Sequence, residues 1–498
     1  MPRPLVRALC AVTVLATAVG ALAGPATAAE PCVATVSGTV WDASAPQSRL
    51  PGLTIDLVDV RTGGVVTSTR TTEDGTYVVS LGCRWDEPVA VRASDPSGFY
   101  APRFGFSSVT LAGATMIWPR EAASYVTNHV AMTPPSRFVP VQPTRVIDTR
   151  SARTGRVGPA TAEMFAIDGL PDDASAVVLN VTATEGTSPS SYVTASGDPA
   201  YRAPWVGGRP STSSLNTSRG RDVANLVTVP VRSDGVVMLY NDSGHTHLVA
   251  DLQGYYSTVE GAGFVPVAPV RALDTRRTSP VGPAEHRTLT LDSSSAAPAP
   301  AGAVAAVVTL TSTEATAPTS YVSAGPAGVT GIESSSVLNA YSGSDVPNLA
   351  IVPLGAGDAI TLYNDQGRTH VVVDVVGWYV EDGGAYFQPV QAARASGSGR
   401  MSAGEVRTFP PTGGGFALPR SAVAVSLNLT TSAPTVSGYL TAYPSRTARP
   451  LASNANSRAG ADIAAAVVVG VDPGFSVYND AGSADVLVDV QGYFTPAG

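Results

Sequence analysis

Three aspartates sit inside apolar, strand-like segments of this sequence. Asp251 lies in LVADLQGYY, Asp374 in VVVDVVGWY and Asp489 in VLVDVQGYF. A carboxylate among apolar residues is costly unless a cation pairs with it. One basic position accompanies all three segments, as Arg145, Arg271 and Arg394. We therefore expect structural ion pairs of Arg145 with Asp251, Arg271 with Asp374 and Arg394 with Asp489. A catalytic or metal-binding carboxylate is the alternative.

A second polar set occurs twice rather than three times. It combines an Asp, an Arg, an Asn and a His, as Asp148, Arg150, Asn225 and His247, and again as Asp274, Arg276, Asn348 and His370. The third copy has Gly397, Gly399, Ala465 and Asp485 at these positions. Such side chains can bind sugar hydroxyls through paired hydrogen bonds. A structural polar network is the alternative, and a solvent-open cleft holding all four groups would favour binding.

Other candidate sites have less support. His245 and His247 share one face of a strand, but no further ligands accompany them, so we expect no metal site. The Tyr-Asn-Asp-x-Gly elements at 240–244, 363–367 and 478–482 predict hairpin loops with glycine at positive φ rather than calcium sites. Trp205 lies in an insertion of the first copy and is a candidate platform for a sugar ring.

Catalytic motifs are missing from the sequence. It contains no nucleophile elbow, no HExxH motif and no phosphate-binding glycine loop. Paired carboxylates contributed by distant strands are the one route to an enzyme that spacing leaves open. We expect a protein that is not an enzyme and needs no cofactor.

These residues recur because one segment is present in three tandem copies. FVPVQPTRVIDTR at 138–150 recurs as FVPVAPVRALDTR at 264–276 and, weakened, as FQPVQAARASGSG at 387–399. The copies span residues 137–257, 263–380 and 386–494, the last one degenerate. Each consists of short β-branched runs between Gly, Pro, Asn and Asp, with no helical period. We expect three β-sandwiches or jelly rolls, each with its own core, strung in a row.

An unrelated domain of residues 29–133 precedes the copies and also reads as β. Its strand candidates are 33–42, 53–60, 65–72, 76–81 and 89–95, with a hairpin that turns at Glu73-Asp74-Gly75. The fold class expected for the whole chain is therefore all-β, with tandem β-sandwich domains.

Two resemblances follow from these motifs. GTVWD, LPGLTIDLVD, TTEDGTYVVSL and VAVRASDPSGFY resemble carboxypeptidase-regulatory-like and collagen-adhesin B-type repeats, which implies a transthyretin-like or carbohydrate-binding-like sandwich. The three copies are similar to the P-x-R-v-x-DTR … D-x-x-GYF modules of secreted actinobacterial and acidobacterial proteins across residues 137–494. This second resemblance implies an exported, surface-associated role.

The N-terminus and the cysteines indicate an oxidising compartment. Residues 1–28 have the basic start, apolar run and small-x-small end of a secretory signal peptide. After it, Cys32 and Cys83 remain, and export favours a disulfide between them over two free thiols. Many adhesin B-type repeats carry a lysine isopeptide crosslink, but all 31 basic residues here are arginine. In that resemblance the cysteine pair would replace the crosslink.

Charge and hydropathy exclude several partners. The net charge is −8, with no basic run, which disfavours nucleic acid and anionic lipid. No later segment is apolar for long enough to span a membrane. We expect a secreted, extracellular or cell-surface protein that binds carbohydrate, either extracellular or cell-wall polysaccharide, or adheres to a surface protein. The alternative is a structural spacer or protein-adhesive module without a glycan site.

Overall fold

The computed structural model describes most of the chain after the predicted signal peptide. The described residues are 33–43, 45–82, 87–97, 100, 102–105, 114, 116–118, 125–127, 129–151, 155–197, 209–231, 234–395, 397–413 and 416–497. Within these ranges the structure is β, with two short 3-10 turns and no α-helix. The predicted signal peptide, Cys32, Cys83 and Trp205 lie outside the described residues, and so does the predicted disulfide.

The first domain is a two-sheet sandwich around a core that includes Val40, Leu57 and Tyr77. In one sheet β1 pairs with β2, β5, β8 and β9, and the other has the order β4-β3-β6-β7. All five predicted strands are present. The strands are β1 (Val33–Asp42), β2 (Ala45–Arg49), β3 (Thr54–Asp59), β4 (Val65–Arg70), β5 (Thr76–Gly82), β6 (Val89–Ser94), β7 (Arg103–Phe104), β8 (Tyr125–Thr127) and β9 (Val130–Met132).

Each copy folds into a sandwich of two antiparallel sheets, which we call units 1, 2 and 3. The strands of unit 1 are β10 (Arg137–Asp148), β11 (Thr161–Ala166), β12 (Ala174–Thr184), β13 (Ser191–Ser196), β14 (Leu215–Thr217), β15 (Val223–Pro230), β16 (Val236–Asn241) and β17 (His247–Ser257). The sheets have the orders β10-β17-β12-β15 and β11-β16-β13-β14. This is the strand order of a jelly roll.

Units 2 and 3 repeat this order, with small additions in unit 3. Unit 2 comprises β18 (Gly263–Asp274), the 3-10 turn η3 (Thr275–Arg277), β19 (Glu285–Thr290), β20 (Ala303–Thr313), β21 (Ser320–Pro326), η4 (Ile332–Ser334), β22 (Leu338–Ala340), β23 (Val346–Pro353), β24 (Ala359–Asn364) and β25 (His370–Val380). Unit 3 comprises β26 (Ala385–Arg394), β27 (Gly399–Met401), β28 (Val406–Phe409), β29 (Thr412–Gly413), β30 (Phe416–Ala417), β31 (Ala424–Ser432), β32 (Gly438–Pro444), β33 (Ala455–Ser457), β34 (Ile463–Gly470), β35 (Phe475–Asn479) and β36 (Ala484–Pro496).

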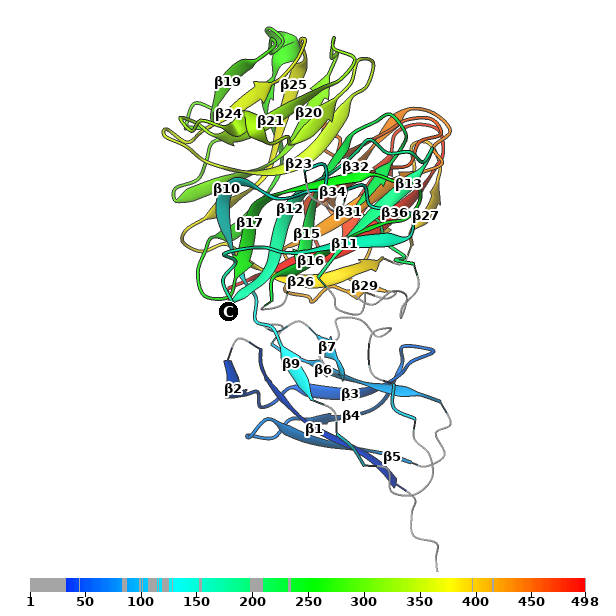
Figure 1. Ribbon diagram of the computed structural model, residues 1–498. Helices are drawn as coiled ribbons and strands as arrows, with labels where there is room; N and C mark the ends of the chain where they lie inside the picture. Colours follow the sequence, from blue (N-terminus) through cyan, green and yellow to red (C-terminus); the bar gives the residue numbers. More distant parts are fainter. Residues whose placement is uncertain are drawn as a thin grey trace, which may run out of the picture.

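The three units are packed together rather than strung in a row (Figure 1). Each has its own core, as expected, but a further core joins all three. Strand β12 shows why, because its side chains alternate between two buried faces. Val177, Leu179 and Val181 enter the core of unit 1, while Ala176 and Val178 enter the shared core. A strand that is apolar on both faces needs a cover on each, and the other units provide the second one.

An aromatic ring closes the shared core at one end. We use this name for Phe138, Tyr256, Phe264, Tyr379, Phe387 and Phe494, all at most 2% exposed. Two side chains come from each unit, and successive centroids around the ring lie 4.2–5.3 Å apart. The Tyr256 and Tyr379 hydroxyls hydrogen-bond to each other, and unit 3 has Phe494 at the third such position. No hydroxyl of the ring is therefore left unpaired.

The aromatic ring explains two of the repeated motifs. A Cβ added to Gly254, Gly377 or Gly492 would overlap the ring of Phe138, Phe264 or Phe387, respectively. The phenylalanine that opens each copy thus needs the glycine of the closing D-x-x-G-aromatic segment. Close packing of this kind leaves no room for a methyl group.

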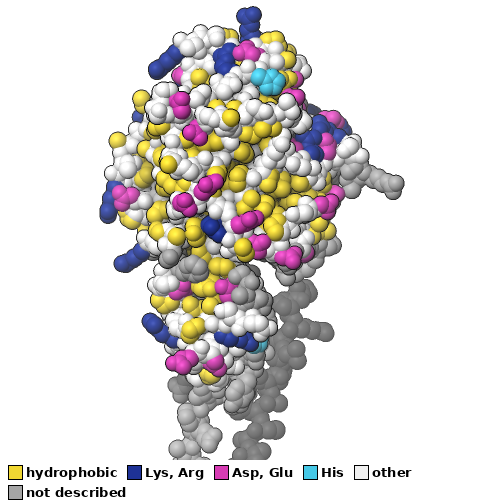
Figure 2. Space-filling view, turned by 90° about the vertical axis from the view of Figure 1, so that its left-hand side faces the viewer, with side chains coloured by type: hydrophobic (Ala, Val, Ile, Leu, Met, Phe, Trp, Pro, Cys, Tyr) yellow, Lys and Arg dark blue, Asp and Glu magenta, His cyan; other side chains and the backbone are white. Residues whose placement is uncertain are grey.

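The first domain joins the units at the aromatic-ring end. The Ser136 amide donates to the Phe387 carbonyl, and the Gln388 side chain donates to the Thr133 carbonyl. Figure 1 shows the first domain beyond this end, apart from the packed units. On the face in Figure 2, basic side chains lie singly or beside acidic ones and form no continuous patch.

Two turns predicted as hairpins are connections between the two sheets of a sandwich. Strands β16 and β17, on either side of the first Tyr-Asn-Asp-x-Gly element, lie in different sheets, and so do β4 and β5 around Gly75. The glycines do have positive φ, +64° at Gly244 and +70° at Gly75. Local sequence locates the chain reversal, but the pairing of the flanking strands depends on distant segments.

Candidate binding site

The arginine–aspartate pairs expected from the sequence are present in all three units. The paired residues are directly opposite in the sheet, on the first and last strands of each unit. Each arginine Nε lies 2.5 Å from one carboxylate oxygen and Nη2 contacts the other, as seen for Arg145 with Asp251, Arg271 with Asp374 and Arg394 with Asp489. Burial raises the pKa of Asp251 and of Asp489, and the arginine only partly offsets this.

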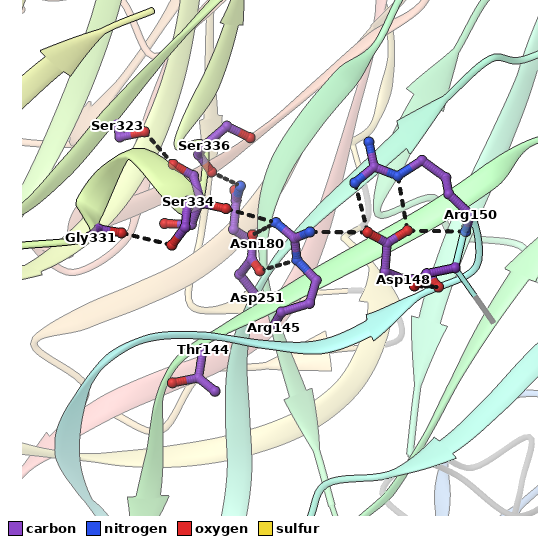
Figure 3. Close-up of polar contacts among 12 residues, drawn as sticks. Thr144, Arg145, Asp148, Arg150, Asn180, Asp251, Ser323, Gly331, Ser334 and Ser336 are labelled. Carbon is purple, nitrogen blue, oxygen red and sulfur yellow. Dashed lines mark hydrogen bonds and ion pairs between the residues drawn. The ribbon is translucent and has the colours of Figure 1, made fainter. Parts of the chain in front are cut away.

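Two of these arginines also link neighbouring units. Figure 3 shows Arg145 between Asp251 and Asp148, with Nη2 donating to the Ser334 carbonyl of unit 2 at 3.2 Å. Arg394 of unit 3 donates in the same way to the Ser211 carbonyl of unit 1 at 3.0 Å. The links therefore run from unit 1 to unit 2 and from unit 3 to unit 1. An ion pair that is structural within one unit also orients the next.

The second polar set splits into two places. Asp148 binds Arg150 through both carboxylate oxygens, at 2.9 and 2.7 Å, and also contacts Arg145. The Arg150 hydrogen bonds lower the pKa of Asp148 to about 2. His247 lies at the same end of the sheet and contacts Thr149. In unit 2 the same arrangement is formed by Asp274, Arg276 and His370 with Thr275.

Asn225 and Asn348 do not join these residues, so the four groups do not converge on one cleft, the arrangement that would favour binding. Each is 1% exposed and lies between two units. Asn348 donates to the Val337 carbonyl and to Asn180 of unit 1, and accepts from the Leu226 amide. All of its polar atoms have protein partners, which leaves none for a sugar. For these two asparagines the contacts favour the structural alternative, in which they pack the units together.

A cavity of about 550 Å³ opens where the three units meet, at the end opposite the aromatic ring. Strand β15 runs from the cavity to the aromatic ring. Its first residue, Val223, lines the cavity, and its last, Pro230, lies level with Ala176 and Tyr256 at the aromatic ring. All three units contribute to its wall. We call it the axial cavity.

Two polar positions of the axial cavity are the same in every unit. They are Asn216, Asn339 and Asn456, and Asp222, Asp345 and Asp462, all of which line it. Within each unit they belong to one segment, N-x-x-x-G-x-D, at 216–222, 339–345 and 456–462. Its glycine has φ of +74°, +71° or +70°, which lets the chain turn sharply at the rim. The third unit keeps this segment although it loses the Asp-Arg-His group.

The N-x-x-x-G-x-D segment is the site signal that sequence reasoning missed. It is present in all three copies, so an alignment of the repeats could have found it. That its copies meet around one cavity could not be seen, because this depends on how the units pack. The volume lies in the range of small-ligand pockets, and its amide, carboxylate and hydroxyl groups suit a polar ligand.

In the described ranges, no group of three or more His, Cys, Asp or Glu side chains is placed to hold a metal ion. Among the same residues no helix is long and apolar enough to cross a membrane.

Comparison with known proteins gives no family for this chain. No family model matches it, and no curated protein does. Among solved structures, one from Sulfolobus turreted icosahedral virus is 10% identical, with a TM-score of 0.17, covering 73% of this chain and 90% of that chain. The RrgB pilus protein of Streptococcus pneumoniae is 10% identical, with a TM-score of 0.13, covering 82% and 74%. Similarities this weak carry no argument about function.

Proposed function

We propose that this protein is a secreted, non-enzymatic carbohydrate-binding protein, and that the axial cavity is its binding site. The observation that carries the proposal is the cavity itself, lined by the same Asn and Asp positions from three units. Amides and carboxylates that converge on a pocket are the groups that bind sugar hydroxyls. The signal peptide and the secreted-module resemblance support an extracellular place of action.

A binding role has more support than catalysis. The buried carboxylates of the sheets are held by arginine on both oxygens, as in Arg394 with Asp489, and are not free to transfer protons. The cavity carboxylates are also engaged, since Asp345 accepts from Thr313 and Asp462 accepts from the Ala433 amide. These contacts fix acceptor groups at the rim.

A pure spacer is the second candidate, and the packing of the units speaks against it. A spacer gains reach by placing domains end to end, whereas these three units share one core. Adhesion to a surface protein stays open as a partner class for the same cavity.

A glycan array with the purified protein tests the proposal, followed by titration of each hit. Asn339→Ala is the diagnostic variant, because its Oδ1 is buried, lines the cavity and accepts no hydrogen bond from the described residues. We expect it to weaken binding at least several-fold. Ser342→Ala, an exposed residue of the same loop that does not line the cavity, is the control. The proposal would be overturned if no glycan binds, or if Asn339→Ala leaves the affinity for a bound glycan unchanged.

A further inference from the structure

The variable positions of the N-x-x-x-G-x-D segments make the axial cavity asymmetric. Two positions after the asparagine stand Ser218, Tyr341 and Arg458, one from each unit. Three positions further on, directly before the aspartate, the residues are Arg221, Ser344 and Ala461. The Asn and Asp positions are the same in all three units, whereas Arg221, Tyr341 and Arg458 each have a different residue at the matching positions of the other two units. All three line the cavity, so a ligand would bind in one orientation.

Arg221 is held rigidly by the neighbouring unit. Its guanidinium lies over the Tyr341 ring, with Cζ 4.5 Å from the centroid, and Nη2 donates to the Ser344 hydroxyl at 3.1 Å. Tyr341 is fixed in turn, because its hydroxyl accepts from the Asp222 amide at 2.6 Å and donates to the Asp222 carbonyl. A guanidinium fixed in this way loses little freedom when it binds a ligand.

The two cavity arginines have no acidic partner among the described residues. Within the described ranges no carboxylate lies within 4 Å of the charged nitrogens of Arg221 or Arg458, whereas most other described arginines of units 1–3 have one. Arg221 and Arg458 line the same cavity, and both burial and the charge of Arg458 lower the pKa of Arg221. Two of the cavity aspartates have other partners, since Asp345 accepts a hydrogen bond from the Thr313 hydroxyl and Asp462 accepts one from the Ala433 amide.

Two partly buried cations that line one cavity repel each other, and an anion bound between them relieves this repulsion. Arginine binds a carboxylate through two parallel hydrogen bonds, which gives this anion a defined place. Around the arginines the wall is polar: it includes the three asparagines and the three aspartates, and Asn339 Oδ1 is buried and unpaired in the described structure. The wall therefore has acceptors for hydroxyl groups beside a pair of cations for one carboxylate.

We propose that the axial cavity binds an acidic saccharide, with a uronic acid carboxylate between Arg221 and Arg458 and its hydroxyl groups on the cavity asparagines. This inference rests on the proposed function and names its ligand class. Trigalacturonate is the probe, maltotriose is the neutral counterpart, and sodium sulfate reports binding of an anion without a sugar.

Calorimetric titration of the purified protein tests this. We expect trigalacturonate to bind at least tenfold more tightly than maltotriose or sulfate. Arg221→Ser and Arg458→Ser should each weaken that binding at least tenfold. Serine stands at the matching positions of other units, as Ser344 and Ser218, so both variants should fold, and a thermal melt checks this. Arg219→Ser removes the same charge from the same loop outside the cavity and should change affinity less than twofold.

The outcomes separate the two proposals. Tight binding of neutral glycans that the arginine variants leave unchanged would overturn the acidic ligand and keep carbohydrate binding. Sulfate binding as tight as that of trigalacturonate would overturn the saccharide assignment in favour of a simple anion. If no glycan binds at all, both proposals fail.

Discussion

Asn348 of unit 2 donates a hydrogen bond of 3.1 Å to Asn180 of unit 1, across the boundary between the two units. Asn225 of unit 1 donates to Asn428 of unit 3 in the same way, at 3.0 Å. At the remaining boundary both positions have changed together, to Thr309 in unit 2 and Ala465 in unit 3. The pair is therefore kept or lost as a whole, as expected where one buried amide alone would lack its partner.

This coupling can be measured by a double-mutant cycle. Asn348→Ala should lower the free energy of unfolding by about 1–3 kcal/mol, because it leaves Asn180 Oδ1 and the Leu226 amide without a partner. Adding Asn180→Thr, which copies the Thr309–Ala465 boundary, should cost clearly less than the sum of the two single changes. Urea denaturation gives all four values, and strictly additive effects would contradict the coupling.

The glycine beneath each ring phenylalanine should not tolerate a side chain. Gly377→Ala places a methyl group where the Phe264 ring lies, so we expect a loss of about 1–3 kcal/mol and a lower melting temperature. Gly186→Ala is the control, since an added Cβ there meets only ordinary contacts and its φ is negative. The prediction is wrong if both variants melt alike.

The buried ion pairs should differ in strength between units. Asp489→Asn leaves Arg394 with no other acidic partner in the described structure, so we expect a loss of about 3 kcal/mol. Asp374→Asn should cost less, because Arg271 keeps its contact with Asp274 at 3.2 Å. Asp382→Asn, in the exposed linker between units 2 and 3, should change little. Equal losses for the two buried aspartates would argue against this order.

Asp148 should increase the free energy of unfolding at neutral pH, and this contribution should be lost at acid pH. Its pKa is about 2 in the folded protein against a usual 3.8, so the folded state favours the charged form. The contribution is complete above pH 3.8 and is lost as the pH falls toward 2. Asp148→Asn should therefore be less stable than the parent at pH 5, with a gap that narrows between pH 4 and 2. Urea denaturation across this range checks it, and a constant gap would refute it.

The sequence predicted the strands and their ion pairs but not how the units assemble. The Asp251 pairing with Arg145 could be inferred because a charge in an apolar strand needs a partner, and the repeats show which arginine is always present. The role of Asn225 could not be inferred, because its partner Asn428 is 203 residues away. The apolar stretch of β12 from Ala176 to Leu179 is buried on both faces, yet nothing local in the sequence shows that another unit covers the second face.

The shared core also affects how the protein would carry tension. The first domain is attached at the aromatic-ring end, and the axial cavity lies at the other end of the same strands. A pull between a ligand in the cavity and the first domain would enter through unit 1, which continues the chain, and unit 3, which is hydrogen-bonded to the first domain, and the shared core would pass part of the force to unit 2. Sandwiches in a row would each bear the whole force, and the weakest would unfold first.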